Sequence, residues 1–176
     1  MSFLTDSIDS ANTIAISGHM RPDGDCVGSC IGLYRYIKKN YPEKNVRVLL
    51  TEIPVSFSYL DDKDAFEYKT DRFDLFVALD CGDCDRLGDV VKDFEQAKKT
   101  INIDHHVSNP GFANENHVEA DASSTCEVLY TLLDKAKLDQ DIAVALYTGI
   151  VHDTGVFKHS NTGKRTMMIA GEFMNY

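Results

Sequence analysis

The sequence predicts an α/β fold in which an open, mainly parallel sheet carries helices on both faces. Short apolar runs typical of buried strands alternate along the chain with stretches of helical periodicity, and such alternation implies parallel strands joined by right-handed crossovers. The length of 176 residues and the hydrophobic content of 43% fit one domain with a substantial core. We therefore expect a single domain over residues 1–176.

Residues 1–51 supply two predicted strands and one predicted helix. Residues 13–17 (TIAIS) are a candidate for a buried strand, and a loop containing Gly and Pro separates them from a helix over residues 26–39. The apolar positions of this helix recur at helical spacing and form one stripe, at Val27, Ile31, Tyr34 and Ile37. Residues 45–51 (NVRVLLT) predict the second strand.

The rest of the chain continues the alternation. Residues 75–80 (LFVALD) and 100–104 (TINID) predict the third and fourth strands, with a helix over 86–98 between them. Ser124 and Glu127 stand at the spacing of a capping box, which marks the start of a helix. The helices predicted after the fourth strand cover residues 124–137, 141–153 and 163–174.

The composition limits the classes of partner. With 28 acidic and 18 basic residues the formal net charge is −10, which argues against a protein that coats long duplex nucleic acid. A nucleotide substrate stays open, because bound cations can reverse the local sign of an acidic pocket. No apolar stretch has the length of a membrane span, and no secretory signal is visible. The odd count of five cysteines indicates reduced thiols, so we expect a cytoplasmic protein.

Ionisable side chains gather where the predicted strands end. In an open parallel sheet, the loops at the carboxyl ends of the strands share one edge and line the binding crevice. Separate segments of the chain deliver aspartates and histidines to this edge: His19, Asp23 and Asp25 after the first strand, Asp80 at the end of the third, Asp104, His105 and His106 at the end of the fourth, and Asp153 at the end of a helix.

Such a cluster has the composition of a metal site. Neighbouring carboxylates repel one another unless something neutralises them, and a mixed His/Asp set without thiolates suits Mn²⁺ or Mg²⁺ better than a structural zinc ion. The number of ligands suits two ions with one carboxylate between them. Paired metal ions clamp the attacking and leaving oxygens in displacements at phosphorus. The residues therefore predict metal-assisted hydrolysis of a phosphate ester.

Four motifs in this sequence resemble those of the DHH phosphoesterases. The segment from His19 to Ser29 (HMRPDGDCVGS) is similar to the first motif and the segment from Leu79 to Asp83 (LDCGD) to the second. Asp104-His105-His106 is similar to the signature for which the family is named, and the segment from His152 to Gly155 (HDTG) to the fourth motif. All four occur in order, and the resemblance covers nearly the whole chain.

The resemblance implies a centre of two divalent ions, Mn²⁺ in first place and Mg²⁺ as the alternative, with Asp80 as the bridge. It divides the other ligands into two sets, His19 and Asp23 for one ion, and Asp25, His105 and Asp153 for the other. It also implies that His106 faces the substrate phosphate and that Asp104 orients the histidines. The segment 122–127 (ASSTCE) resembles a recurrent family segment, interpreted as a helix start near the site.

Within the family, the Pro-Asp-Gly-Asp and Ser-Ser-Thr segments most resemble the nano-RNases, also called bifunctional oligoribonuclease and PAP phosphatases. Those enzymes usually carry a second, C-terminal substrate-binding domain of the DHHA1 type, with a glycine-rich motif that ends in histidine. No such motif occurs up to Tyr176. We therefore expect this chain to hold the catalytic domain without that second domain.

Several alternatives stay open at this point. The substrate could be a short oligoribonucleotide or a 3′-phosphoadenosine nucleotide, and relatives act as inorganic pyrophosphatases or cyclic-dinucleotide phosphodiesterases. A non-catalytic metal- or nucleotide-binding module is the alternative of another class, and a homodimer is compatible with the sequence. Asp23 and Asp25 could also form only a turn before a helix. Asp83 and Asp85 are interpreted as the start of the helix that follows, and His152 as a packed or surface histidine.

Overall fold

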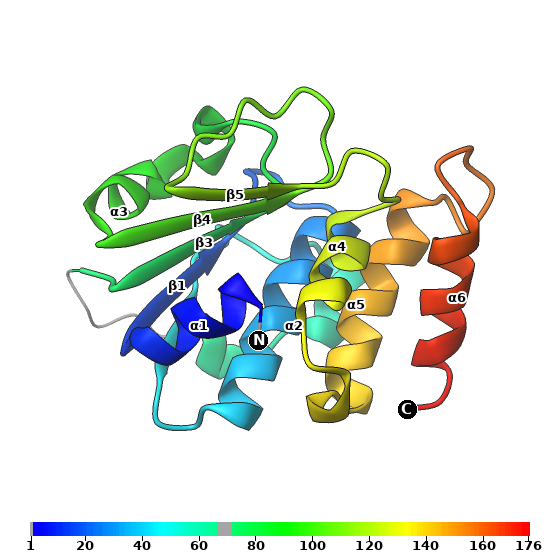
Figure 1. Ribbon diagram of the computed structural model, residues 1–176, viewed down its shortest axis with the longest axis horizontal. Helices are drawn as coiled ribbons and strands as arrows, with labels where there is room; N and C mark the ends of the chain where they lie inside the picture. Colours follow the sequence, from blue (N-terminus) through cyan, green and yellow to red (C-terminus); the bar gives the residue numbers. More distant parts are fainter. Residues whose placement is uncertain (1, 67–71) are drawn as a thin grey trace.

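The computed structural model describes residues 2–66 and 72–176. It contains one sheet of five strands in the order β2-β1-β3-β4-β5, and every pairing is parallel (Figure 1). This arrangement confirms the predicted open α/β sheet. The strands are β1 (Thr13–Ser17), β2 (Asn45–Val48), β3 (Leu75–Leu79), β4 (Lys99–Asp104) and β5 (Glu115–Val118).

The register of the three central strands aligns their carboxyl ends. All five residues of β3 are buried, as expected of a strand that is covered on both faces. Ser17 at the end of β1 pairs with Ala78 of β3, and Ala78 pairs with Asn102 of β4. The residues that follow these strands therefore emerge side by side at one edge of the sheet.

The helices cover the two faces of the sheet unequally. Figure 1 shows α2, α4, α5 and α6 together on one face and α3 across the other. The larger hydrophobic core lies under the first group, and a smaller core around Phe73, Phe76 and Phe94 lies under α3. The α-helices are α1 (Phe3–Ser10), α2 (Gly24–Asn40), α3 (Val91–Gln96), α4 (Thr125–Leu132), α5 (Gln140–Asp153) and α6 (Lys164–Phe173). Short 3₁₀ turns are η1 (Val55–Leu60), η2 (Lys63–Phe66), η3 (Cys84–Val90) and η4 (Lys135–Lys137).

Two predicted helices are shorter than the sequence pattern indicates. The stretch 86–98 is divided between η3 and α3, because Gly88 has φ +61° and ψ −129° and interrupts the helical backbone. The stretch 124–137 leaves the helical conformation at Leu133, and Asp134 then caps the separate turn η4. Asp83 accepts a hydrogen bond from the backbone amide of Arg86, which confirms that it begins η3.

One α-helix and one strand were not predicted. Helix α1 is capped by Ser2, whose hydroxyl accepts a hydrogen bond from the Thr5 amide, and it buries Leu4 and Ile8 against the larger core. Strand β5 lies at the edge of the sheet and alternates half-buried and exposed residues. Within residues 2–66 and 72–176, no helix is both long and apolar enough to cross a lipid bilayer.

Candidate metal centre

The six candidate ligands and the two candidate catalytic residues meet at the carboxyl edge of the sheet. Figure 1 shows the strands pointing toward the start of α2, the start of α4 and the end of α5. The loop after β1, the residue after β3 and the end of β4 complete this edge. The residues brought together there are His19, Asp23, Asp25, Asp80, Asp104, His105, His106 and Asp153.

Asp80 stands at the middle of the cluster. It directly follows β3 and has φ +56°, in the left-handed region that few residues other than glycine adopt. Its Oδ2 lies 3.5 Å from Nε2 of His19, and its Oδ1 lies 3.7 Å from Nε2 of His105. The hydroxyl of Thr125 donates a hydrogen bond of 3.1 Å to Oδ1. The two oxygens of one buried carboxylate therefore face two different histidines.

His19 presents its Nε2 to the carboxylates. Its Nδ1 lies 3.0 Å from the carbonyl oxygen of Met20, which can only accept, so Nδ1 carries a proton and Nε2 is the nitrogen that could bind metal once its own proton is lost. Nε2 is 3.8 Å from Oδ1 of Asp23. Burial by itself would lower the pKa of His19, but the carboxylates of Asp23 and Asp80 outweigh burial and raise it to about 11.

Asp23 has two roles in the structure. Its Oδ1 accepts hydrogen bonds from the backbone amides of Asp25 and Cys26, so it is the N-cap of α2. The same oxygen faces His19. Burial opposes ionisation of Asp23, but His19 and the Cys26 amide together hold its pKa well below the ordinary value. Asp23 therefore caps the helix that follows it, as the alternative of a turn before a helix allows, and this is compatible with a role as a ligand.

Asp25 is fully buried and is held by the start of α4. The backbone amides of Thr125 and Cys126 donate to its two carboxylate oxygens over 2.6 and 2.9 Å. Burial raises the pKa of Asp25 well above its ordinary value, and the nearby charges of Asp80 and Asp153 raise it further. A cation at this position would relieve that repulsion.

His105 and Asp153 complete this side of the cluster. Nε2 of His105 is 3.2 Å from Oδ2 of Asp153, and one ligand atom from each of His105, Asp153 and Asp25 lies within 4.8 Å of the others. Burial lowers the pKa of His105, but the contact with Asp153 and the charges of Asp25 and Asp80 raise it to about 9. These groups come from the residue after β4, from α5 and from α2, so only the folded chain assembles them.

His106 is fixed by a buried carboxylate. Its Nδ1 donates to Oδ1 of Asp104 over 2.7 Å, which raises the pKa of His106 and leaves Nε2 directed away from that contact. The amide of Asn109 donates to the other oxygen of Asp104 over 2.6 Å. Burial opposes ionisation of Asp104, but these two partners lower its pKa below the ordinary value. The His106 side chain itself is 44% exposed, so a substrate can reach it.

The donor set fits divalent cations. Asp25 and Asp80 are 0% and 2% exposed, and buried carboxylates this close together are costly without a counter-charge. One set of donor atoms lies around Nε2 of His19 and Oδ2 of Asp80, and the other around Nε2 of His105 and Oδ1 of Asp80. Oxygen and imidazole donors suit Mn²⁺ and Mg²⁺. The structure thus contains groups that could hold metal.

Comparison with known proteins identifies the family. The model of the DHH family, N-terminal domain, matches residues 13–150. The chain belongs to the DHH family. The matched DHH region includes the first three motifs of the sequence, and Asp153 lies just beyond it.

Curated proteins from several bacteria are similar to this DHH chain. It is 34% identical over 170 residues to the bifunctional oligoribonuclease and PAP phosphatase NrnA of Bacillus subtilis, covering 94% of this chain and 53% of that protein. It is 33% identical over 171 residues to the probable NrnA of Streptococcus mutans, covering 96% of this chain and 54% of the relative. The chain therefore spans about half the length of the curated relatives that it matches.

Two solved structures share the fold of this DHH chain. An exopolyphosphatase-related protein from Bacteroides fragilis superposes with a TM-score of 0.87 at 24% identity, over 98% of this chain and 55% of that one. A putative family II inorganic pyrophosphatase from Methanococcus jannaschii superposes with a TM-score of 0.70 at 20% identity, over 92% of this chain and 55% of that one. At these identities the likeness concerns the fold alone.

Side chains of α4 and α6 support the candidate metal centre through contacts that the sequence did not predict. The carboxylate of Glu127 is buried and accepts hydrogen bonds from the hydroxyls of Ser123 and Thr166 over 2.6 and 2.7 Å. Arg165 of α6 lies 3.0 Å from its other oxygen. Ser124 caps α4 as predicted, but the Glu127 side chain of the expected capping box turns to these partners instead.

Asn161 is a second unforeseen support. Its side-chain amide donates to the carbonyl oxygens of Ser123 and Asp153, over 3.0 and 3.2 Å. It therefore ties the segment before α4 to the end of α5, next to Asp25 and Asp153. The sequence signal was the Ser-Ser-Thr segment, which indicated a helix start near the site but not its partners.

Proposed function

We propose that the chain carries the catalytic centre of a metal-dependent phosphoesterase that uses two divalent ions, with Mn²⁺ as the preferred metal. His19 and Asp23 would hold one ion, Asp25, His105 and Asp153 the other, and Asp80 both. The proposal rests on the orientation of the Asp80 carboxylate, whose Oδ2 faces His19 while its Oδ1 faces His105. Ions bound there would supply Lewis-acid stabilisation of the charge that develops at phosphorus.

The protein's own groups contribute binding and orientation. His106 would donate a hydrogen bond from Nε2 to a phosphate oxygen of the substrate, because its Nδ1 already donates to Asp104. The raised pKa of His106 favours the imidazolium, which binds an anion more strongly than the neutral ring does. Thr125 keeps the Asp80 carboxylate in place through its hydroxyl and holds Asp25 through its amide. Prior fixation of this kind supports catalysis through positioning.

The proposed substrates are short oligoribonucleotides and 3′-phosphoadenosine nucleotides. This proposal rests on the names of the relatives from Bacillus subtilis and Streptococcus mutans. The net charge of −10 agrees with a small substrate held by metal ions rather than a long nucleic acid held by a basic surface. The homodimer and the cytoplasmic location stay predictions from the sequence.

The test is hydrolysis by the Mn²⁺-loaded protein of a diribonucleotide, a 3′-phosphoadenosine nucleotide and inorganic pyrophosphate. We expect activity on the first two, and Asp80→Asn should lower it by at least about a hundredfold. Asp85→Asn is the matched control, because Asp85 is an exposed aspartate in η3, close in sequence to Asp80. Hydrolysis of pyrophosphate alone would assign the chain to the pyrophosphatase alternative, and tight Mn²⁺ binding with no hydrolysis would favour the non-catalytic module.

A further inference from the structure

An apolar pocket lies beside the metal centre, between η1 and the carboxyl-terminal half of α5. It has a volume of about 360 Å³ and is lined by Phe57, Tyr59, Val151, His152, Gly155 and Val156, among others. Volumes of this order, with mainly apolar and aromatic walls, are typical of pockets that bind small organic ligands. Tyr59 and Val156 are 59% and 61% exposed, so apolar surface faces solvent next to a strongly acidic cluster.

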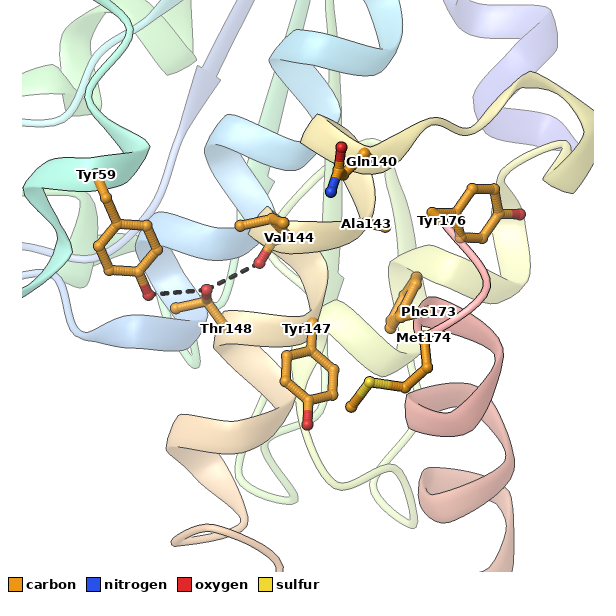
Figure 2. Close-up of a pocket in the computed structure, with 9 residues that line it drawn as sticks. All are labelled: Tyr59, Gln140, Ala143, Val144, Tyr147, Thr148, Phe173, Met174 and Tyr176. Carbon is orange, nitrogen blue, oxygen red and sulfur yellow. Dashed lines mark hydrogen bonds between the residues drawn. The ribbon is translucent and has the colours of Figure 1, made fainter.

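The aromatic wall is held in place by specific contacts. The hydroxyl of Tyr59 lies 2.9 Å from Oγ1 of Thr148, which itself donates to the carbonyl of Val144 over 2.8 Å. Figure 2 shows these two hydrogen bonds on the surface of α5. It draws a neighbouring pocket, which has Tyr59, Tyr147 and Thr148 in common with the apolar pocket described here. Because Thr148 donates to the carbonyl, Tyr59 must donate to Thr148, which fixes the exposed ring.

The side chain of His152 lies between this pocket and the metal centre. On the pocket side, its ring meets that of Phe57 edge to face, with centroids 5.6 Å apart. On the other side, its Nδ1 is 3.7 Å from Oδ1 of Asp153, and it lies in one group with Asp23 and Asp153 whose ligand atoms are within 4.8 Å of one another. Gly24 lies behind the ring, since a Cβ at this position would come within 2.6 Å of His152 Cβ.

We infer that this pocket binds the nucleobase of the substrate whose phosphate lies at the metal centre. The inference rests on the proposed function and adds the position and chemistry of base recognition to it. A second phosphate is a poor occupant, because His152 is the one ionisable side chain besides the tyrosines among the lining residues. A planar base fits the aromatic and aliphatic walls, and stacking tolerates any base because each has a π-face.

The test separates base binding from phosphate binding. Kd values of the Mn²⁺-loaded protein are measured by calorimetry for AMP and for ribose 5-phosphate, which has no base. Wild type should bind AMP about tenfold more tightly, in the range expected for one stacked base. Phe57→Ala and Tyr59→Ala should bring the ratio of the two Kd values close to one, whereas Phe57→Tyr should keep it. Phe112→Ala is the matched control, since Phe112 is a half-buried phenylalanine packed on the other face of the sheet.

The outcomes distinguish this inference from the function on which it rests. A wild-type ratio near one, or a ratio unchanged in both alanine variants, overturns the base pocket while the phosphoesterase proposal stands. Failure of the Mn²⁺-loaded wild type to bind either phosphate overturns both. Tyr59→Ala decides the matter if Phe57→Ala is unfolded, because Tyr59 lies mostly in solvent and contributes little to the core.

Discussion

Replacing Glu127 by alanine should weaken metal binding, although Glu127 is not itself a candidate ligand. Its buried carboxylate joins Ser123, ahead of α4, to Thr166 and Arg165 of α6. The first amides of α4 in turn hold both oxygens of Asp25. Loss of Glu127 frees the segment that fixes a candidate ligand, so the effect should pass from α6 through α4 to the metal centre.

The contacts of Glu127 set the size of the effect. Alanine leaves the buried hydroxyls of Ser123 and Thr166 without their acceptor, at about 1 to 1.5 kcal/mol each. Arg165 is 45% exposed and keeps Glu119 as a partner at 2.6 Å, so the lost ion pair adds less than about 1 kcal/mol. We expect a loss of about 2–4 kcal/mol in the free energy of unfolding. Glu127→Gln keeps an acceptor for the hydroxyls and should lose only about 1 kcal/mol.

The assay combines urea unfolding with calorimetric titration of Mn²⁺. Support residues of metal ligands typically contribute about ten- to hundredfold to affinity, so Glu127→Ala should weaken Mn²⁺ binding by about tenfold and Glu127→Gln by less. Glu115→Ala is the matched control, because Glu115 lies on β5 in an ion pair with Lys99 that is partly exposed. If Glu127→Ala is destabilised but binds Mn²⁺ with wild-type affinity, the Glu127 network does not position Asp25 and the reasoning is refuted.

Three further predictions concern metal, protons and pH. Binding of Mn²⁺ near pH 7 should release protons and tighten as pH rises. His19 and His105, with pKa values raised to about 11 and 9 in the metal-free protein, must each lose a proton to act as ligands. Calorimetric titrations in buffers of different ionisation enthalpy measure the proton release, and binding without proton release would contradict the prediction. Mn²⁺ should raise the melting temperature of wild type but not of Asp80→Asn, which differential scanning calorimetry tests; an equal rise in both would exclude Asp80 as the shared ligand. Asp74→Asn should destabilise the protein above about pH 4, because Lys98 at 2.7 Å holds the pKa of Asp74 well below its ordinary value. The extra stability of wild type is lost as pH falls toward the depressed pKa. Urea midpoints of wild type and variant that differ equally at every pH would argue against this ion pair as the cause.

The sequence predicted the sheet and the candidate cluster because both follow from local patterns and one topological rule. The apolar runs at β1, β3 and β4 are strong signals, and an aspartate or histidine follows each of them within two residues. Parallel strands bring such residues to one edge. This rule alone predicted that His19, Asp80 and His105 lie together, as the structure shows.

The parts that were missed depend on long-range contacts or weak patterns. β5 has half-buried and exposed residues and no apolar run, so its sequence resembles a loop. The hydrogen bonds from Thr125 and Cys126 to Asp25 join residues about a hundred positions apart. Glu127 stands at capping-box spacing, but its partner Arg165 lies on another helix. No local spacing rule includes such a partner.

Asp23 and Asp153 lie at opposite ends of their helices, so their negative charges should affect the stability of the metal-free protein differently. Asp23 caps the amino end of α2, where backbone amides stabilise a negative charge, whereas Asp153 is the last residue of α5, where the helix dipole opposes one. Asp153 also faces the buried Asp25, whose pKa its charge helps to raise, and Nε2 of His105 lies 3.2 Å from its Oδ2. In EDTA, Asp23→Ala should therefore lower the free energy of unfolding by about 1 kcal/mol, and Asp153→Ala by less, as measured by urea unfolding. With Mn²⁺ present both variants should lose affinity for the metal. The stabilisation that Mn²⁺ gives to the protein should therefore fall further in Asp153→Ala than in Asp23→Ala. The opposite order of the two variants in EDTA would show that helix ends do not govern the charge balance of this centre.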